Sequence, residues 1–138
     1  MMRKYLFGTK FSKNSFDLAM LVLRIGFGLL MIPAHGWPKL KNFDTVNENF
    51  ISFMGLSSQI SLGLTVFAEF FCSILIIFGF FTRWAVIPLI IAMLVALDQY
   101  NWEIFGNNEL AFAFLLGYLT ILLLGAGRYS MDKLISGK

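Results

Sequence analysis

Four long runs of apolar residues, separated by short polar stretches, organise this chain. The runs extend from about residue 17 to 35, 60 to 81, 84 to 99 and 109 to 125. A helix that crosses a bilayer needs about 20 largely apolar residues, whereas a membrane strand alternates polar and apolar positions. Because the runs are continuous, we predict an all-α protein, with residues 1–138 forming one domain and four transmembrane helices forming a bundle.

The connections between the runs predict how the helices begin and end. Phe80–Arg83 alone joins the second run to the third. A loop this short makes two helices antiparallel neighbours. Pro33 is expected to kink or end the first helix. Pro88 is expected in the first turn of the third helix, where a missing N–H group costs little.

The longest connection, Gly36 to Gln59, contains a further helix signal. Thr45 and Glu48 have the spacing of a capping box, and apolar residues follow from Phe50 to Met54. We expect a short amphipathic helix that lies in the membrane interface. A coil over the mouth of the bundle is the alternative. Either structure would cover a site that opens on that side.

The composition agrees with a membrane protein. The chain has 138 residues, of which 58% are hydrophobic and only 14% are charged. A soluble domain has roughly a quarter of its residues charged, so this chain lacks the polar surface that water requires. Its 16 phenylalanines also exclude a disordered chain.

Charged residues divide unequally between the two sides of the predicted bundle. With four spans both termini lie on one side, which holds most of the 11 basic residues. These are Arg3, Lys4, Lys10, Lys13, Arg83, Arg128, Lys133 and Lys138. The opposite side has only Lys39 and Lys41, so the positive-inside rule places both termini in the cytoplasm. The net charge of +3 thus indicates contact with anionic lipid and no nucleic-acid partner.

A signal peptide is the alternative interpretation of the first run. Ala34–Gly36 has the small-x-small form of a cleavage site, after basic residues and an apolar segment. The run is long for such a segment, and Arg24 interrupts it, so we expect no cleavage.

Arg24 and Glu69 are the ionisable residues well inside the apolar runs, where a charge is costly and often functional. Counting helix rise from the cytoplasmic edge places Arg24 at a depth of about 10 Å and Glu69 at about 21 Å. His35 lies deeper still, so Glu69 can pair with either Arg24 or His35. Structural roles remain open as well. Arg24 can extend its side chain to the headgroups, and Glu69 can join helices.

The end of the first run carries a second polar cluster, His35–Lys39. His35 is the only histidine, and because histidine titrates near neutral pH it can exchange protons. A histidine that merely ends a helix beside an interfacial tryptophan is equally consistent. Asp98, on the same side, either lines a pocket or is solvated. His35 cannot build a metal site alone, and the one cysteine, Cys72, lies within the second apolar run. The sequence also contains no motif of a soluble enzyme.

Several motifs, in their order and spacing over nearly the whole chain, resemble the DoxX family of small bacterial four-helix membrane proteins. They are Leu23–Gly26, His35–Gly36 with Lys39, Glu69, Phe78–Arg83 and Leu124–Asp132. The chain departs from the family in the third run, where Asp98 stands at a position that is histidine in many relatives. A contribution of that histidine to the chemistry would be missing here.

The resemblance implies a bacterial inner-membrane protein whose polar core consists of Arg24, His35, Lys39 and Glu69. Some DoxX-like proteins are associated with thiosulfate:quinone oxidoreductase, and others with a membrane complex that handles thiol and oxidative stress. We therefore expect a redox-associated subunit that binds a small lipophilic molecule, such as a quinone. A buried carboxylate and a histidine suit the proton transfers of quinone chemistry.

The expected site is an outward-opening pocket lined by Glu69, His35 and Lys39, with Arg24 deeper. Expected partners are the lipid bilayer, subunits of an oxidoreductase and further copies of the chain. Two alternatives remain. One is an assembly subunit without a ligand, in which polar residues only fix helix packing. The other is a small-molecule transporter, which would need an oligomer because the chain has no internal repeat.

Overall fold

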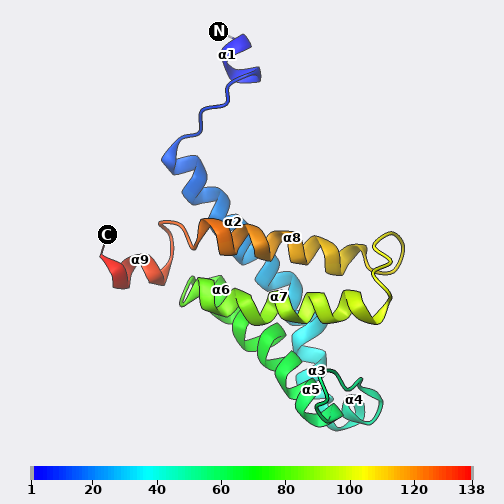
Figure 1. Ribbon diagram of the computed structural model, residues 1–138. Coiled ribbons are helices and arrows are strands. Elements are labelled where there is room, and N and C mark those ends of the chain that lie inside the picture. The colour runs from blue at the N-terminus through cyan, green and yellow to red at the C-terminus, as the bar shows by residue number, and fades with distance from the viewer. Residues whose placement is uncertain (1, 138) are drawn as a thin grey trace.

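Helices form all the regular structure of the computed structural model, which describes residues 2–137 and has no strand in that range. The expected all-α class is therefore confirmed (Figure 1). The helices are α1 (Met2–Leu6), α2 (Lys13–Met31), η1 (Ile32–Gly36), α3 (Trp37–Lys41), α4 (Phe43–Asn49), α5 (Ser58–Val66), η2 (Phe67–Cys72), α6 (Ser73–Phe78), α7 (Thr82–Gln99), α8 (Glu109–Leu124) and α9 (Met131–Ser136). The labels η1 and η2 denote π-helical segments, whose turns are wider than those of an α-helix.

Within residues 2–137, three helices are long and apolar enough to cross a membrane. They are the continuous helix Lys13–Lys41, made of α2, η1 and α3, the helix Ser58–Phe78, made of α5, η2 and α6, and α7. The fourth apolar run forms α8, which has 16 residues and is shorter than these. All four runs are thus helical, and the first helix extends six residues beyond its expected end at residue 35.

The two proline predictions have different outcomes. Pro33 does not end the first helix, since the chain continues as a helix to Lys41, but it lies in η1, where the α-helix gives way to wider π-helical turns. Pro88 was expected in the first turn of the third helix, and this prediction is wrong. Because α7 already begins at Thr82, Pro88 lies in its interior, where it cannot donate a hydrogen bond to the carbonyl of Trp84.

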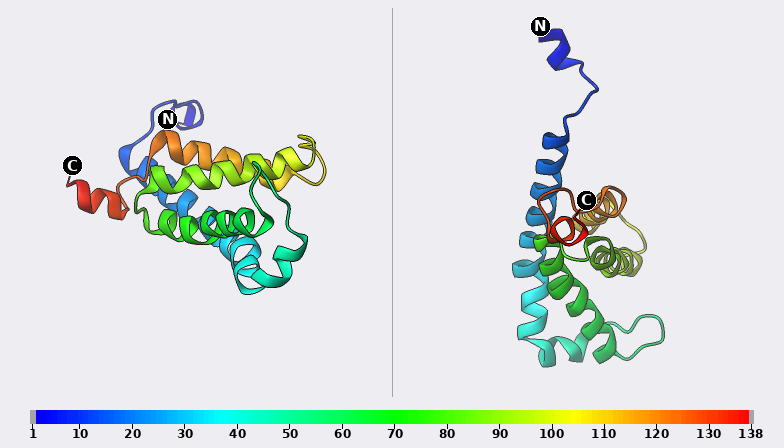
Figure 2. Two further views of the ribbon diagram at one scale, coloured as in Figure 1. Left: turned by 60° about the horizontal axis from the view of Figure 1, so that its bottom comes forward. Right: turned by 90° about the vertical axis from the view of Figure 1, so that its left-hand side faces the viewer.

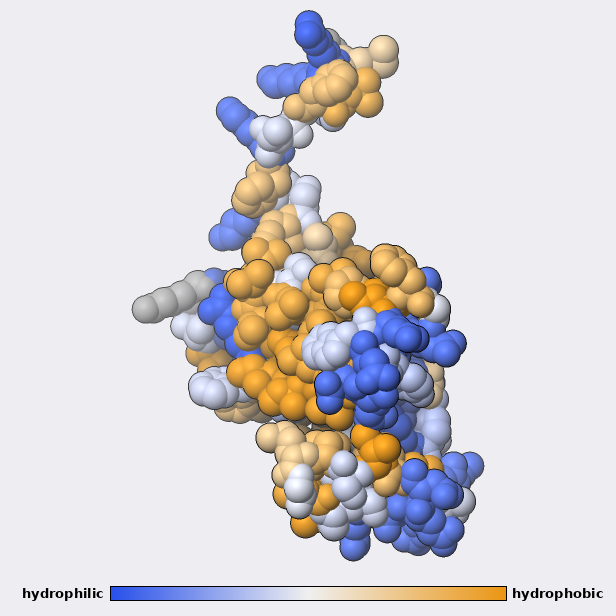
Figure 3. Space-filling model, turned by 45° about the vertical axis from the view of Figure 1, so that its right-hand side comes forward, coloured by the Kyte–Doolittle hydropathy of each residue, from blue (hydrophilic) through white to orange (hydrophobic). Residues whose placement is uncertain are grey.

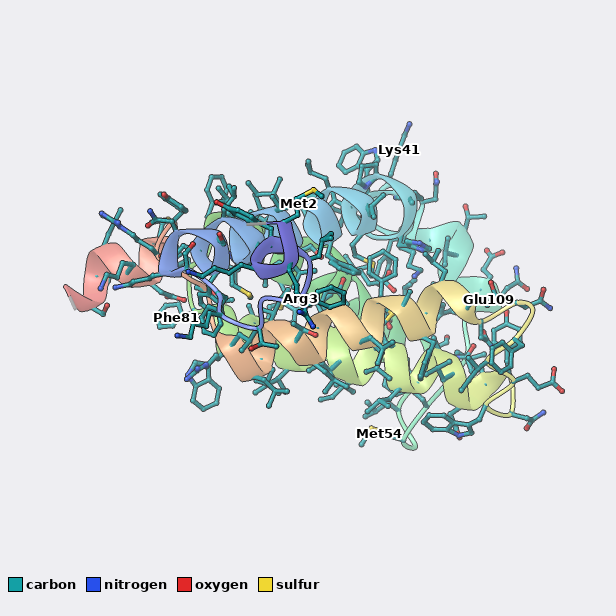
Figure 4. All side chains as sticks on the ribbon, turned by 90° about the horizontal axis from the view of Figure 1, so that it is seen from above. Met2, Arg3, Lys41, Met54, Phe81 and Glu109 are labelled. Atoms are coloured by element: carbon teal, nitrogen blue, oxygen red, sulfur yellow. The ribbon has the colours of Figure 1, made fainter. Side chains whose placement is uncertain are left out.

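A short helix does lie between the first two long helices, but at another position than expected. α4 begins at Phe43, directly after the turn that ends α3, so Thr45 lies inside the helix and cannot be its cap. The apolar residues from Phe50 to Leu56 follow α4 as a coil, with a turn at Met54 and Gly55. Figure 4 shows Met54 at the tip of this loop. The capping-box prediction is therefore wrong.

The core lies where the long helices cross. α7 packs along α8, and α2 packs against α6 (Figures 1 and 2). The core contains buried apolar residues from all four of these long segments. They include Met20 and Met31 of the first helix, Cys72 and Ile76 of the second, Val86, Leu89 and Leu97 of α7, and Phe114, Tyr118 and Ile121 of α8. Two glycines allow close packing here: a Cβ atom on Gly28 would lie 2.3 Å from Ile77, and one on Gly117 would lie 2.4 Å from the ring of Phe27.

The outer surface of the helices is apolar over a wide area. Figure 3 shows hydrophobic surface spread across one face of the helical body, with hydrophilic patches beside it and a tail of mixed character. Large side chains such as Leu30, Phe71 and Leu123 are half exposed or more. A water-soluble monomer rarely exposes apolar patches this large, so this surface suits the hydrocarbon of a bilayer.

Candidate functional site

An ion pair between Lys39 and Glu69 is the centre of the candidate site. Lys39 Nζ lies 2.5 Å from Glu69 Oε2, and it is the one ion pair within residues 2–137. The Glu69 side chain is 6% exposed and that of Lys39 is 25% exposed, so the pair is largely removed from solvent. Glu69 therefore pairs neither with Arg24 nor with His35. Lys39 reaches it because the first helix continues beyond Pro33.

The backbones of the first two long helices touch at this point. A Cβ atom on Gly36 would lie 2.7 Å from the carbonyl oxygen of Glu69 and 2.9 Å from the amide nitrogen of Phe70. Gly36 has an ordinary helical φ of −69°, so the position requires glycine for space and not for its dihedral freedom. The contact joins η1 to η2 and brings Lys39 within reach of Glu69.

A pocket of about 460 Å³ opens beside the ion pair. α5, η2, α7 and the loop after α4 form its walls, and apart from Lys39 and Glu69 most of its surface is apolar. The wall residues include Phe50, Phe53, Met54, Leu64, Phe67, Ala68, Pro88, Ile91, Ala92 and Ala96. Because Leu64, Phe67 and Ile91 are each about half exposed, the pocket opens on the apolar lateral surface of the helices.

His35 lies next to this site without lining the pocket. Its ring meets Phe114 of α8 edge to face, with 6.1 Å between the ring centroids. Phe114 in turn stacks on Tyr118 at 5.8 Å, so the imidazole ends a row of aromatic rings in the core. The imidazole has no hydrogen-bond partner among the residues that the structure describes. It immediately precedes Gly36 and therefore lies beside the backbone of Glu69.

Arg24 is fully buried at the other end of the helices, away from the pocket. Its Nη1 donates to the carbonyl oxygens of Ile76 at 3.2 Å and Ile77 at 3.3 Å, and its Nη2 donates to that of Tyr129. The first two carbonyls belong to the last turn of α6, where that of Ile76 also accepts a hydrogen bond from the amide of Gly79 at 3.2 Å. Arg24 thus joins α2, α6 and the segment after α8. Its side chain does not extend to the headgroups.

Two aspartates complete this arrangement, which we call the Arg24 junction (Asp17, Arg24, Gly79 and Asp132). The carboxylate of Asp132 accepts hydrogen bonds from the amides of Phe81 at 2.8 Å and Thr82 at 3.0 Å, which begin α7. The amide of Asp132 donates to the carbonyl of Gly79. The buried Asp17 accepts from the amide of Arg128 at 2.9 Å.

Gly79 is the residue that lets Arg24 approach α6. It ends the helix with a φ of +69°, a conformation that glycine adopts at little cost. A Cβ atom here would lie 2.3 Å from Arg24 Nη1. The motifs at residues 23–26, 78–83 and 124–132 therefore meet in one structural unit. Asp132 ends the motif at residues 124–132, but neither it nor Asp17 was predicted as a site residue, because their partners are backbone amides far along the chain.

Asp98 lies apart from both groups. It is exposed in the last turn of α7, and its carboxylate accepts a hydrogen bond from the indole of Trp102 at 3.2 Å. Its neighbour Gln99 lines the pocket, whereas Asp98 does not. The described part of the chain contains no cluster of three potential metal ligands.

Comparison with known proteins identifies the family. The model of the DoxX family matches residues 19–102, which include Arg24, the ion pair and all the residues that line the pocket. This chain belongs to the DoxX family. The DoxX-family chain is also 32% identical over 127 residues to inner membrane protein YqjF of Escherichia coli (strain K12), an alignment that covers 88% of this chain and 95% of the relative. No solved structure gives a significant match.

The resemblance seen in the sequence is therefore confirmed. This DoxX-family chain is a membrane protein with helices of membrane-spanning length, and its relative and apolar helices together support an inner-membrane location. The matched region ends at residue 102, before α8, so the aromatic partners of His35 lie outside it.

Proposed function

We propose that this DoxX-family protein is a redox-associated subunit that binds a small lipophilic molecule with a polar head group, such as a quinone. The observation that carries the proposal is the apolar pocket of about 460 Å³ with one ion pair in its wall. Pockets for small molecules commonly have this size, and they combine apolar walls with a few polar groups that orient the ligand.

The chemistry of the pair suits a quinone head group. The Lys39 ammonium has three N–H donors, and one of them is directed to Glu69. The others are available to donate to a quinone carbonyl oxygen. Reduction of a quinone to a hydroquinone takes up two electrons and two protons. A partner subunit would supply the electrons, and the Glu69 carboxylate, with His35 beside it, would exchange the protons.

The lateral opening suits the rest of such a molecule. Leu64, Phe67 and Ile91 form an apolar exit from the pocket toward the bilayer. An isoprenoid tail can leave through this exit while the head group stays at the ion pair. Met54 and the loop around it cover the neighbouring side of the pocket. Asp98 and Arg24 take no direct part in this proposal.

A titration with short-chain ubiquinone and menaquinone analogues tests the proposal on the full chain in lipid nanodiscs. Ala96→Leu fills the pocket without touching the ion pair, and we expect it to weaken binding at least tenfold. Glu69→Gln keeps the side-chain shape but removes the charge that holds Lys39, and we expect a loss of about tenfold, the effect of one charge-assisted hydrogen bond.

Ala113→Leu is the matched control, because Ala113 is exposed on α8 and lies outside the pocket. Its affinity should equal that of the unmodified protein. A protein that binds none of the quinones, or an Ala96→Leu variant with undiminished affinity, overturns the proposal. If Glu69→Gln lowers only the yield of folded protein, the residue serves assembly and not binding.

We further propose that residues 1–138 form one domain, that α8 completes a four-helix transmembrane bundle, and that both termini face the cytoplasm. Eight of the 11 basic residues lie on the predicted cytoplasmic side. In cells with a permeabilised outer membrane, an impermeant maleimide should label Asn107→Cys and not Lys10→Cys. Native Cys72 is buried and gives little background. The reverse labelling pattern would contradict this orientation.

A further inference from the structure

A second hollow, of about 620 Å³, lies at the Arg24 junction, at the opposite end of the helices from the first pocket. The start of α7, the end of α8 and α9 surround it. Its wall carries two basic side chains, Arg83 and Lys133, from segments 50 residues apart in the chain. Figure 4 shows Phe81, at the start of α7, at the opposite end of the molecule from Glu109.

Both basic groups are available to a ligand. Arg83 is exposed, and its guanidinium lies beside Gly125, where a Cβ atom would be 3.3 Å from Nη2. Within residues 2–137, neither Arg83 nor Lys133 has an ion pair or a side-chain hydrogen bond. Asp132 lines the same hollow, but each of its carboxylate oxygens already accepts a backbone N–H group. With two basic side chains and one carboxylate, the wall of the hollow carries a net positive charge.

Thr82 adds an independent sign of a ligand. Its side chain is 1% exposed, lines the hollow, and has a hydroxyl group without a partner among the described residues. A buried hydroxyl without a hydrogen bond is costly, and most such groups in proteins are satisfied. An oxygen-rich group bound in the hollow would accept this hydrogen bond.

The rim of the hollow is apolar. Trp84 is 75% exposed, and Phe81 and Leu124 are each about half exposed. Tryptophan is enriched at the level of lipid headgroups, and basic pockets between membrane helices bind anionic headgroups. We propose that this hollow binds the phosphate group of an anionic phospholipid, with Arg83, Lys133 and the Thr82 hydroxyl on the phosphate and the acyl chains along Trp84 and Leu124.

Trp84 provides a local probe for the test. Trp37→Phe and Trp102→Phe leave it as the sole tryptophan of the full-length chain. This protein is reconstituted into phosphatidylcholine vesicles that contain either brominated phosphatidylglycerol or brominated phosphatidylcholine. We expect brominated phosphatidylglycerol to quench Trp84 at a several-fold lower mole fraction than brominated phosphatidylcholine does. This ratio measures the preference for the anionic lipid, and each basic group near an anionic headgroup raises the affinity about fivefold.

Arg83→Gln with Lys133→Gln should reduce this preference to near unity without changing Tm, because these side chains form no hydrogen bond or ion pair within residues 2–137. Thr82→Val, which keeps the side-chain shape, should reduce it at least twofold. The matched control, Lys4→Gln with Lys10→Gln, removes the same charge from the exposed N-terminal tail and should keep the preference.

Two results would overturn the assignment. One is that the lipid preference does not depend on these two side chains specifically. The control would then lose as much preference as the Arg83 and Lys133 variant, or that variant would keep its full preference, and general surface charge would account for the effect. The other is displacement of the brominated lipid by inorganic phosphate beyond a chloride control of equal ionic strength, which would assign the hollow to free phosphate.

Discussion

Replacing Arg24 with methionine is expected to lower the free energy of unfolding by about 3–5 kcal/mol, the usual cost of breaking a buried charged network. Methionine fills similar space but removes the donor of the Ile77 and Tyr129 carbonyl oxygens and leaves that of Ile76 with the amide of Gly79 alone. The last turn of α6 and the segment after α8 would then lose their attachment to α2. Unfolding of the purified protein by titration with SDS measures the change.

Two further variants separate the geometry of Arg24 from its charge. Arg24→Lys keeps the charge, but an ammonium cannot reach three carbonyls in the way that a planar guanidinium does, so we expect an intermediate loss. Arg128→Gln removes an exposed arginine whose side chain has no partner in the described residues, and it should change stability by a few tenths of a kcal/mol. An Arg24→Met protein that is normally stable but binds no quinone would instead place Arg24 in the ligand site.

The helices were predictable from the sequence because a continuous apolar run of membrane-spanning length has few other solutions. The partner of Glu69 was not predictable in this way. Depths counted at the rise of a straight α-helix, together with an expected end near Pro33, left Lys39 outside the first helix. The π-helical segment η1 carries the first helix past Pro33 to Lys41, and η2 changes the helical rise around Glu69. Pro33 indicates a perturbed helix, but not that the helix continues beyond it.

The role of Arg24 was hidden for a different reason. Its partners are backbone carbonyls, which every residue carries, and the most distant of them lies 105 residues along the chain. The same holds for Asp132, whose partners are backbone amides 50 and 51 residues away. A sequence shows that a buried charge must be satisfied, but not which backbone group satisfies it. The motifs at residues 23–26, 78–83 and 124–132 indicated the family without showing that they meet.

The two intramembrane charges first considered together therefore have separate tasks. Arg24 holds the helix ends at the junction, whereas Glu69 lies at the pocket with Lys39. The proposed quinone binding should then depend on Glu69 and the pocket wall, and stability on the Arg24 junction. Gly36 is the exception, because it serves both packing and the position of Glu69.

Gly36→Ala is expected to lower the free energy of unfolding by about 2–3 kcal/mol, the cost of overpacking a tight contact. The added methyl group would lie 2.7 Å from the carbonyl oxygen of Glu69 and 2.8 Å from its carbonyl carbon. These are backbone atoms in a helix, so they cannot turn aside as a flexible side chain would. The first two long helices must separate, and Lys39 then moves away from Glu69.

Gly26→Ala and Gly63→Ala are the matched controls, because they lie in the same two long helices and a Cβ atom on either meets nothing within 4 Å. Each should raise the free energy of unfolding by about 0.5–1 kcal/mol, the usual gain from replacing glycine inside a helix. Gly36→Ala should also weaken quinone binding about tenfold, because the displaced Lys39 loses one charge-assisted hydrogen bond. The two controls should bind with the affinity of the unmodified protein. Equal stability of all three variants would show that the contact between η1 and η2 does not position Glu69.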